Sequence, residues 1–155
     1  MSIGVTVSNM PNRYNGYDLD PTYRNAFGQP LLRLTYNFTD NDRKIARFVG
    51  QKAAEIGRLL NATTMDAGDG ALGDYSIVPY QSTHNTGGAI MGASPRDSVV
   101  NRYLQSWDVS NVFVVGASAF PHNSAYNPTG PVGALAYWVA DAIRTRYRQR
   151  PGALV

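Results

Sequence analysis

The chain has 155 residues, which fits one average domain, and its 43% hydrophobic content and ten tyrosines are typical of a folded globular protein. It contains no cysteine, which excludes a disulfide framework, a thiolate metal site and a cysteine nucleophile. The formal net charge is +3, and no run of 18 apolar residues occurs, so we expect no membrane-spanning segment.

The first 38 residues have the pattern of strands and turns. Apolar and small polar residues alternate over 1–7, which predicts a strand at the start of the sequence and suggests a piece of something longer. Residues 9–21 are rich in Asn, Tyr, Asp and Gly and predict a long loop. The clearest strand is expected over 31–38, because Leu32, Leu34, Tyr36 and Phe38 would share one face. We therefore expect a sheet with one covered face.

A helix is predicted to follow this strand. Thr39, Asp40 or Asn41 would cap it, and apolar residues recur with a 3.6-residue period over five turns. The opposite face is charged, which is typical of a solvated surface. We expect the helix to cover the sheet. The apolar positions are Ile45, Phe48, Val49, Ala53, Ile56, Leu59 and Leu60.

A glycine motif over residues 68–73 satisfies the spacing G-x-G-x-x-G of dinucleotide-binding turns. Such a turn must follow a strand and open a helix. Here a helix and a polar loop precede it, and Pro79 interrupts the segment that follows. The motif is therefore interpreted as a chance match.

The stretch 82–92 holds one of only two histidines, His84, ahead of Gly87, Gly88 and Gly92. Histidine has an unperturbed pKa of roughly 6.5 and exchanges protons near neutral pH. Glycine lets a flat ligand approach the main chain closely. The pattern is compatible with a proton-transfer site against a planar cofactor. Residue types alone favour a simpler interpretation, a glycine-rich turn that carries a solvated histidine.

The last third predicts a buried strand over 111–116, a loop of small and polar residues over 117–126, and a final helix that ends at Pro151 and Gly152. Asn127 would cap this helix, with Pro128 at its first position. Four arginines between 144 and 150 favour a helix C-terminus over a nucleic-acid surface. The apolar stripe is Val132, Leu135, Ala136, Val139, Ala140, Ile143 and Tyr147.

Four motifs in this order resemble the C-terminal signature of the glucose-methanol-choline (GMC) flavoprotein oxidoreductases. The likeness is greatest to gluconate and related sugar dehydrogenase large subunits, and it extends over nearly the whole chain. The motifs are His84, Gly87, Gly88, Met91 and Gly92; Ser98-Val99-Val100; the run from Asn111 to Gly116 with Ala117-Ser118-Ala119-Phe120-Pro121; and Asn127-Pro128-Thr129.

The resemblance implies an α+β fold in two parts. Residues 1–110 would belong to the substrate-binding domain, an antiparallel sheet covered by helices. Residues 111–155 would be the last strand and helix of the FAD-binding domain. The N-terminal flavin-binding half, with its dinucleotide fingerprint, is absent from this sequence.

The same resemblance assigns site residues. His84 matches the catalytic histidine, and Asn127 matches the partner position that hydrogen-bonds the same substrate hydroxyl. Substrate contacts would come from Asn85 and Tyr126, and no metal is implied. Residues implied at the FAD are Gly87, Gly88, Ala117, Ser118, Asn127, Pro128 and Thr129.

Simpler interpretations exist for several of these residues. Asn127 would then be a helix cap, which leaves its amide nitrogen available. Tyr126 would pack against the protein, and His122 would be a loop histidine, because it falls outside the matched positions.

The resemblance implies an FAD-dependent sugar or sugar-acid dehydrogenase that transfers hydride from a carbinol to flavin N5. Its partners would be the missing FAD-binding half and a cytochrome c or quinone acceptor subunit, on the periplasmic side of the inner membrane; without the resemblance, a cytoplasmic location is the default. The alternative is a non-catalytic module that binds a ligand or a partner. A hydrolase built on Ser82 or Ser118 is disfavoured, because neither lies in a nucleophile elbow.

Overall fold

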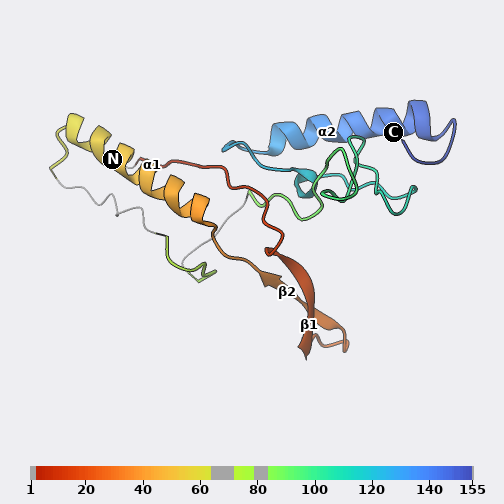
Figure 1. Ribbon diagram of the computed structural model, residues 1–155, viewed down its shortest axis with the longest axis horizontal. Coiled ribbons are helices and arrows are strands. Elements are labelled where there is room, and N and C mark those ends of the chain that lie inside the picture. The colour runs from red at the N-terminus through yellow and green to blue at the C-terminus, as the bar shows by residue number, and fades with distance from the viewer. Residues whose placement is uncertain (1–2, 64–71, 79–83, 155) are drawn as a thin grey trace. The chain divides into compact units, whose positions relative to one another are not determined.

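The computed structural model describes residues 3–63, 72–78 and 84–154. The chain forms two compact units, Met1–Gln81 and Ser82–Val155. The first contains a β-hairpin and a long helix, and the second contains irregular backbone packed on a helix (Figure 1). The content of strands and helices agrees with an α+β chain. The division at residue 110 into substrate and flavin domains stays a prediction.

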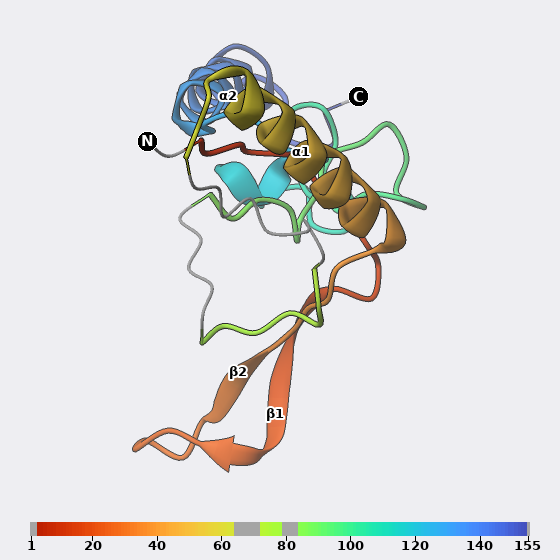
Figure 2. The ribbon, with the colours of Figure 1, turned by 90° about the vertical axis from the view of Figure 1, so that its left-hand side faces the viewer.

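The hairpin pairs β1 (Gly16–Arg24) with β2 (Pro30–Thr35) as antiparallel strands (Figure 2). Tyr17 lies opposite Leu34, and Leu19 lies opposite Leu32. Its turn is held by Asn25, whose Oδ1 accepts the N–H groups of residues 27 and 29 at 2.9 and 3.0 Å. The register is irregular between Leu19 and Arg24. That stretch contains Pro21, which cannot donate to a ladder.

Two strand predictions in this region are wrong. Residues 3–7 form no strand, and β1 lies where a loop was predicted over 9–21. The alternation at 3–7 finds no neighbouring strand among the described residues, and a strand without a partner is not stable. β1 forms despite its polar composition because β2 supplies a ladder and Arg33 an opposite charge for Asp18.

The Asp18–Arg33 pair lies on the face of the hairpin opposite to that of Tyr17 and Leu19. The Arg33 guanidinium donates two hydrogen bonds to the Asp18 carboxylate, one of them from Nε at 2.7 Å. This pairing holds the pKa of Asp18 below its usual value. Because both side chains are about half exposed, the pair fixes register more than it adds stability.

The expected covered face of the sheet is not formed. Tyr17, Leu19 and Leu32, which share one face of this two-stranded sheet, are each at least 60% exposed. Periodicity identified the apolar side chains but not what covers them. Among the described residues of the first unit, no other helix or strand packs over the hairpin.

The helix α1 (Asp40–Leu59) confirms its prediction. Thr39 caps it: the Thr39 hydroxyl accepts the Asp42 N–H at 3.2 Å, and the Asp42 carboxylate accepts the Thr39 N–H at 2.7 Å. The expectation that this helix covers the sheet is wrong. It makes no extended packing with either strand, and Phe48 on its apolar stripe is 57% exposed.

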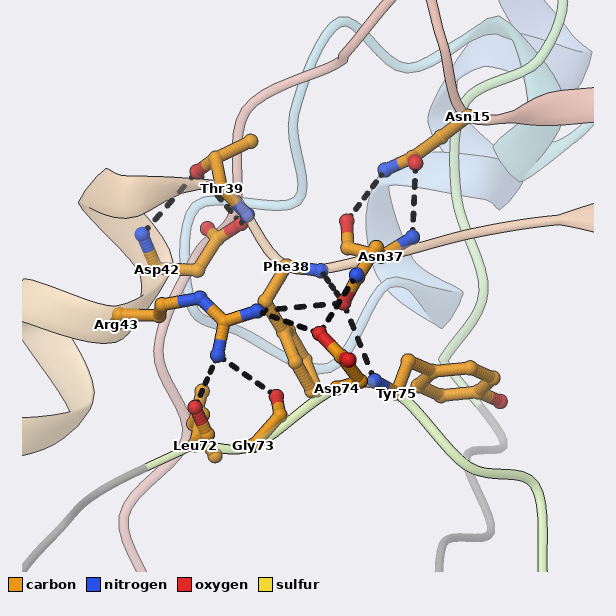
Figure 3. Close-up of polar contacts among 10 residues, drawn as sticks. All are labelled: Asn15, Asn37, Phe38, Thr39, Asp42, Arg43, Leu72, Gly73, Asp74 and Tyr75. Carbon is orange, nitrogen blue, oxygen red and sulfur yellow. Dashed lines mark hydrogen bonds and ion pairs between the residues drawn. The ribbon is translucent and has the colours of Figure 1, made fainter.

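A polar cluster joins the junction of β2 and α1 to residues 72–75 (Figure 3). The Arg43 guanidinium donates to the carbonyl oxygens of Leu72 and Gly73, the latter at 2.8 Å. The Asn37 amide donates to the Asp74 carboxylate at 3.0 Å. These bonds satisfy backbone groups that have no secondary structure to pair them. Most of the 68–73 glycine motif lies outside the described residues.

The second unit is built on α2 (Thr129–Ala142), which continues as the π-helix η2 (Ile143–Tyr147). A short 3-10 helix, η1 (Ala117–Ala119), packs beside it. Of the predicted stripe, Val139 is buried, and Leu135 and Ile143 pack on the core. The core residues are Val100, Leu104, Ala119 and Val139, with Tyr103, Ala142 and Leu154 as a second cluster.

The predicted buried strand over 111–116 is not formed. A single bridge joins Phe113 to Gln105, and the Val114 N–H donates to the Leu104 carbonyl at 2.8 Å. Val112 and Val115 are nearly half exposed. A buried central strand requires hydrogen-bonded neighbours on both sides, and this segment has only one.

In the described ranges, no helix combines the length and apolar composition that crossing a membrane requires.

Two buried amides, Asn101 and Gln105, tie the C-terminal tail to this core. Gln105 is 1% exposed, and its Nε2 donates to the carbonyls of Ser110 and Gly152 at 2.6 and 2.7 Å. Its Oε1 accepts the Leu154 N–H at 2.6 Å. Asn101 adds a bond of 2.6 Å to the Leu154 carbonyl. The tail is thus fixed by side chains in place of a sheet.

We expect Gln105→Ala to lower the free energy of unfolding of this chain by about 2 to 4 kcal/mol, because the buried Leu154 N–H and two part-buried carbonyls lose their partner. Urea denaturation followed by circular dichroism measures it. The matched control is Gln149→Ala, an exposed glutamine whose loss should change stability by less than about 0.5 kcal/mol. Equal effects of the two substitutions would contradict the tethering role.

Gly92 lies against Ser98 at a contact that tolerates no side chain. A Cβ at Gly92 would stand 2.7 Å from the Ser98 Cβ. Ser98 cannot easily move, because its hydroxyl donates to the Ser94 carbonyl at 2.6 Å and accepts the Trp107 indole N–H at 2.9 Å. Two of the sequence motifs are therefore held together by close approach.

We expect Gly92→Ala to destabilise the chain by about 1 to 3 kcal/mol through this overlap. Gly133→Ala is the control, because its added Cβ meets nothing within 4 Å and alanine favours a helix. Thermal unfolding of both variants compares them. A Gly92→Ala protein as stable as the Gly133→Ala protein would refute the steric argument.

Candidate active site

The glycine stretch after His84 lies directly beside η1. The Gly87 N–H donates to the Ala117 carbonyl at 3.0 Å, the Ala89 N–H to the Ser118 carbonyl at 3.0 Å, and the Met91 N–H to the Ala119 carbonyl at 2.8 Å. Two motifs about 30 residues apart in sequence are therefore one structural element. These bonds use backbone groups alone.

The main chain at this element carries no side chains at Gly87 and Gly88. Gly87 and Gly88 have φ values of +83° and +97°, a region that side chains rarely adopt. A Cβ at Gly88 would meet nothing within 4 Å, so the space beside this exposed residue is open. Ala117 and Ser118 carry small side chains. A planar ring system therefore fits against this backbone better than a branched ligand would.

His84 is half buried and lies three residues before Gly87. Asn85 is exposed, and its side chain makes no hydrogen bond within the part of the chain that the structure describes. Ser82, which the hydrolase alternative invokes, lies outside the described residues. The described ranges hold no group of three His, Cys, Asp or Glu side chains that could bind a metal ion.

The loop between η1 and α2 is strained. Ser124 and Ala125 have φ values of +55° and +57°, which cost about 1 to 2 kcal/mol each for residues with a Cβ. The His122 Nδ1 accepts the Ser124 N–H at 3.0 Å, and the Asn123 carbonyl accepts the Tyr126 N–H at 3.2 Å. His122 therefore shapes this loop. Strained loops of this kind cluster at ligand sites.

Asn127 does not cap α2, which corrects the sequence prediction. The helix begins at Thr129, and the Val132 N–H donates to the carbonyl of Pro128, which is the residue before the helix. The Asn127 side chain is exposed and makes no hydrogen bond among the described residues. Both its donor and its acceptor are available. Tyr126, next to it, is 76% exposed.

The N-terminus of α2 has no side-chain cap. The first N–H groups of a helix have no intrahelical partner and carry a partial positive charge. Thr129, as the first helical residue, therefore offers a free backbone donor. This end of α2 favours a negatively charged ligand group.

The structure thus joins Gly87 to Ala117 and Ala89 to Ser118 directly, with Gly88 between the two bonds. Asn127 and Tyr126 follow in the same unit, and no hydrogen bond links the Asn127 side chain to the glycine stretch. Sequence reasoning gave no role to the supports of this element, Ser98 and Trp107. In the sequence, Ser98 and Trp107 are nine residues apart, and that spacing by itself predicts no contact between them.

Comparison with known proteins identifies relatives over most of this chain. The family model described as GMC oxidoreductase matches residues 17–136. A gluconate 2-dehydrogenase flavoprotein from Pantoea cypripedii is 53% identical over 92% of this chain and 23% of its own length. A 2-methyl-1,2-propanediol dehydrogenase from Mycolicibacterium austroafricanum is 34% identical over 89% of this chain and 24% of its own. The fructose dehydrogenase large subunit of Gluconobacter japonicus is 31% identical over 90% of this chain and 24% of its own.

The chain therefore spans about a quarter of the length of these relatives. The family match covers the hairpin, α1, the glycine stretch, η1 and the first half of α2. The site residues proposed from the sequence all fall within the matched range. The chain belongs to the GMC oxidoreductase family.

Proposed function

We propose that this chain forms part of an FAD-dependent dehydrogenase that oxidises a carbinol of a sugar or sugar acid. The observation that carries the proposal is the bare turn at Gly87 and Gly88, hydrogen-bonded to η1 and preceded by His84. The GMC family match and the sugar dehydrogenases among the relatives support it. The alternative is a module of the same fold that binds a ligand without catalysis.

The chemistry requires a base close to the substrate. Loss of hydride from a carbinol carbon leaves positive charge there unless the hydroxyl is deprotonated in step. In the proposed mechanism His84 accepts this proton, which a neutral imidazole does well near pH 7. The Asn127 amide donates a hydrogen bond to the same oxygen and orients it. Its unused hydrogen-bonding groups suit this role.

The residues present fit a flavin. The backbone of Gly87 and Gly88 would lie against the ring, with Ala117 and Ser118 beside it. Pro128 and Thr129 would bring the start of α2 to the ring, where its partial positive charge stabilises negative charge. FAD, when bound, supplies the hydride acceptor at N5. The chain itself supplies the proton acceptor and the hydrogen-bond donors.

The substrate class follows from the exposed polar groups and the relatives. The Asn85 amide and the Tyr126 hydroxyl are exposed and suited to the several hydroxyls of a polyol. Two relatives are named for gluconate and fructose. Because these relatives are a flavoprotein and a large subunit, we further propose that electrons leave through a separate cytochrome c or quinone-reducing subunit.

His84→Ala in the complete enzyme should lower turnover of gluconate about 10² to 10⁴-fold, because the base is lost. Bound flavin and KM should change little. Dye reduction measures turnover, and flavin absorbance measures cofactor content. Gln149→Ala is the control, since it removes an exposed side chain outside the candidate site and should leave turnover nearly intact. Unchanged turnover in His84→Ala would contradict the assignment of His84 as the base. Binding of gluconate without flavin would support the alternative of a non-catalytic binding module.

Asn127→Ala should lower turnover at least about tenfold while leaving the melting temperature unchanged, because the side chain makes no capping hydrogen bond. A residue that only capped the helix would show the reverse: a loss of about 1 kcal/mol in stability and normal turnover. Dye-linked kinetics and calorimetry on the same preparation separate the two results.

A further inference from the structure

The positive charge of this protein is concentrated in the second unit. Residues 82–155 contain six arginines, no lysine and three aspartates, whereas residues 1–81 contain eight basic and eight acidic residues. The whole excess of +3 therefore belongs to the second unit. Four of its arginines lie between 144 and 150, at the end of α2 and η2.

An aromatic pair organises this charge. The rings of Tyr103 and Trp138 stack with centroids 5.8 Å apart and planes 6° from parallel. Tyr103 is buried, and Trp138 is 51% exposed. The Trp138 indole N–H donates to the Arg102 carbonyl at 3.0 Å, which fixes the ring. The Trp138 ring is thereby held in one position with half of its surface open to solvent.

Two guanidinium groups lie over the same tyrosine ring. The Cζ atoms of Arg102 and Arg146 are 4.9 and 5.2 Å from the Tyr103 centroid. Neither has a carboxylate partner within the described ranges, whereas Arg144 is paired with Asp141 at 2.8 Å. The ring attracts each cation but supplies no negative charge to neutralise it. A carboxylate from another protein would supply that charge.

We infer that Arg102, Tyr103, Trp138 and Arg146, which we call the arginine–aromatic cluster, form a docking surface for an acidic face of a partner protein. Arginine, tryptophan and tyrosine are the residues that dominate protein–protein interfaces, where lysine is depleted. A guanidinium binds a carboxylate through two parallel hydrogen bonds. The absence of lysine from residues 82–155 matches this composition.

The composition of the arginine–aromatic cluster favours a protein as the binding partner over a nucleic acid or a membrane. A nucleic-acid or membrane surface needs a field of many cations. Here Asp141 pairs with one of the nearby arginines, and the two unpaired guanidiniums sit on a rigid aromatic support. Such an arrangement suits a few carboxylates at fixed positions. The inference does not depend on His84 or on the proposed reaction.

The test is binding of a fluorescein-labelled peptide of alternating glutamate and alanine to the complete enzyme, followed by fluorescence anisotropy. We expect R102Q/R146Q to weaken binding at least tenfold. R13Q/R96Q removes the same charge from exposed arginines outside the cluster and should weaken it less than twofold. Equal losses of peptide affinity in the two double variants would overturn the inference, because net charge alone would then explain the binding.

A charge-conserving pair sharpens the result. R102K/R146K keeps the net charge but loses the planar fork, so we expect most of the loss seen in R102Q/R146Q. Full binding by R102K/R146K would overturn the proposed geometry. Near-UV circular dichroism of the two tryptophans shows whether each variant is folded. Because binding requires no turnover, this test and that of His84 fail independently.

Two further probes distinguish the kind of partner. Vesicles of phosphatidylserine and phosphatidylcholine represent a membrane, and a 20-base-pair DNA duplex represents nucleic acid. We expect the enzyme to bind the acidic peptide more tightly than either probe at physiological salt, and R102Q/R146Q to affect the peptide most. Tighter binding of vesicles or DNA, with the same loss in R102Q/R146Q, would overturn the protein-partner inference.

Discussion

The second unit depends on the hydrogen bonds of two buried amides. Its core around Val100 and Leu104 is enclosed by irregular backbone, in which isolated bridges pair some N–H and C=O groups and side chains must pair others. A buried backbone group without a partner costs about 1 to 3 kcal/mol. Gln105 pairs three backbone groups, among them the N–H of the buried Leu154, and Asn101 pairs the Leu154 carbonyl. The tail then closes one side of the core.

The candidate site rests on this core through small residues and close contacts. Gly92 packs on Ser98, and the glycine stretch pairs with η1, whose last residue, Ala119, is fully buried. The backbone at Gly88 is therefore open to a ligand on one side and anchored on the other. A site made of main chain holds its shape without long side chains. This is the pre-organisation that binding a rigid, flat group requires.

In the first unit, polar contacts outnumber the buried apolar ones. Its hairpin and α1 leave many apolar side chains exposed, and its internal bonds are mostly polar, as in the cluster around Asn37 and Arg43 (Figure 3). The sequence pattern predicted the start of α1 correctly, because the capping box at Thr39 is a strong local signal. It did not predict how the sheet is covered, because a strand pattern specifies an apolar face and does not specify the partner that buries it.

Much of the candidate site could be anticipated from the sequence. Residue types alone set its local chemistry: a histidine before paired glycines, small residues at 117 and 118, and an Asn-Pro-Thr run before an apolar helix. The periods of α1 and α2 were equally plain, because helix periodicity and helix caps are local properties. Tertiary structure decided the rest. It placed residues 87–91 against η1, left the Asn127 side chain without a capping bond, prevented the strand at 111–116, and stacked Trp138 on Tyr103. Each of these depends on which distant segment supplies a hydrogen-bond or packing partner, and a linear pattern carries no information about such long-range pairing.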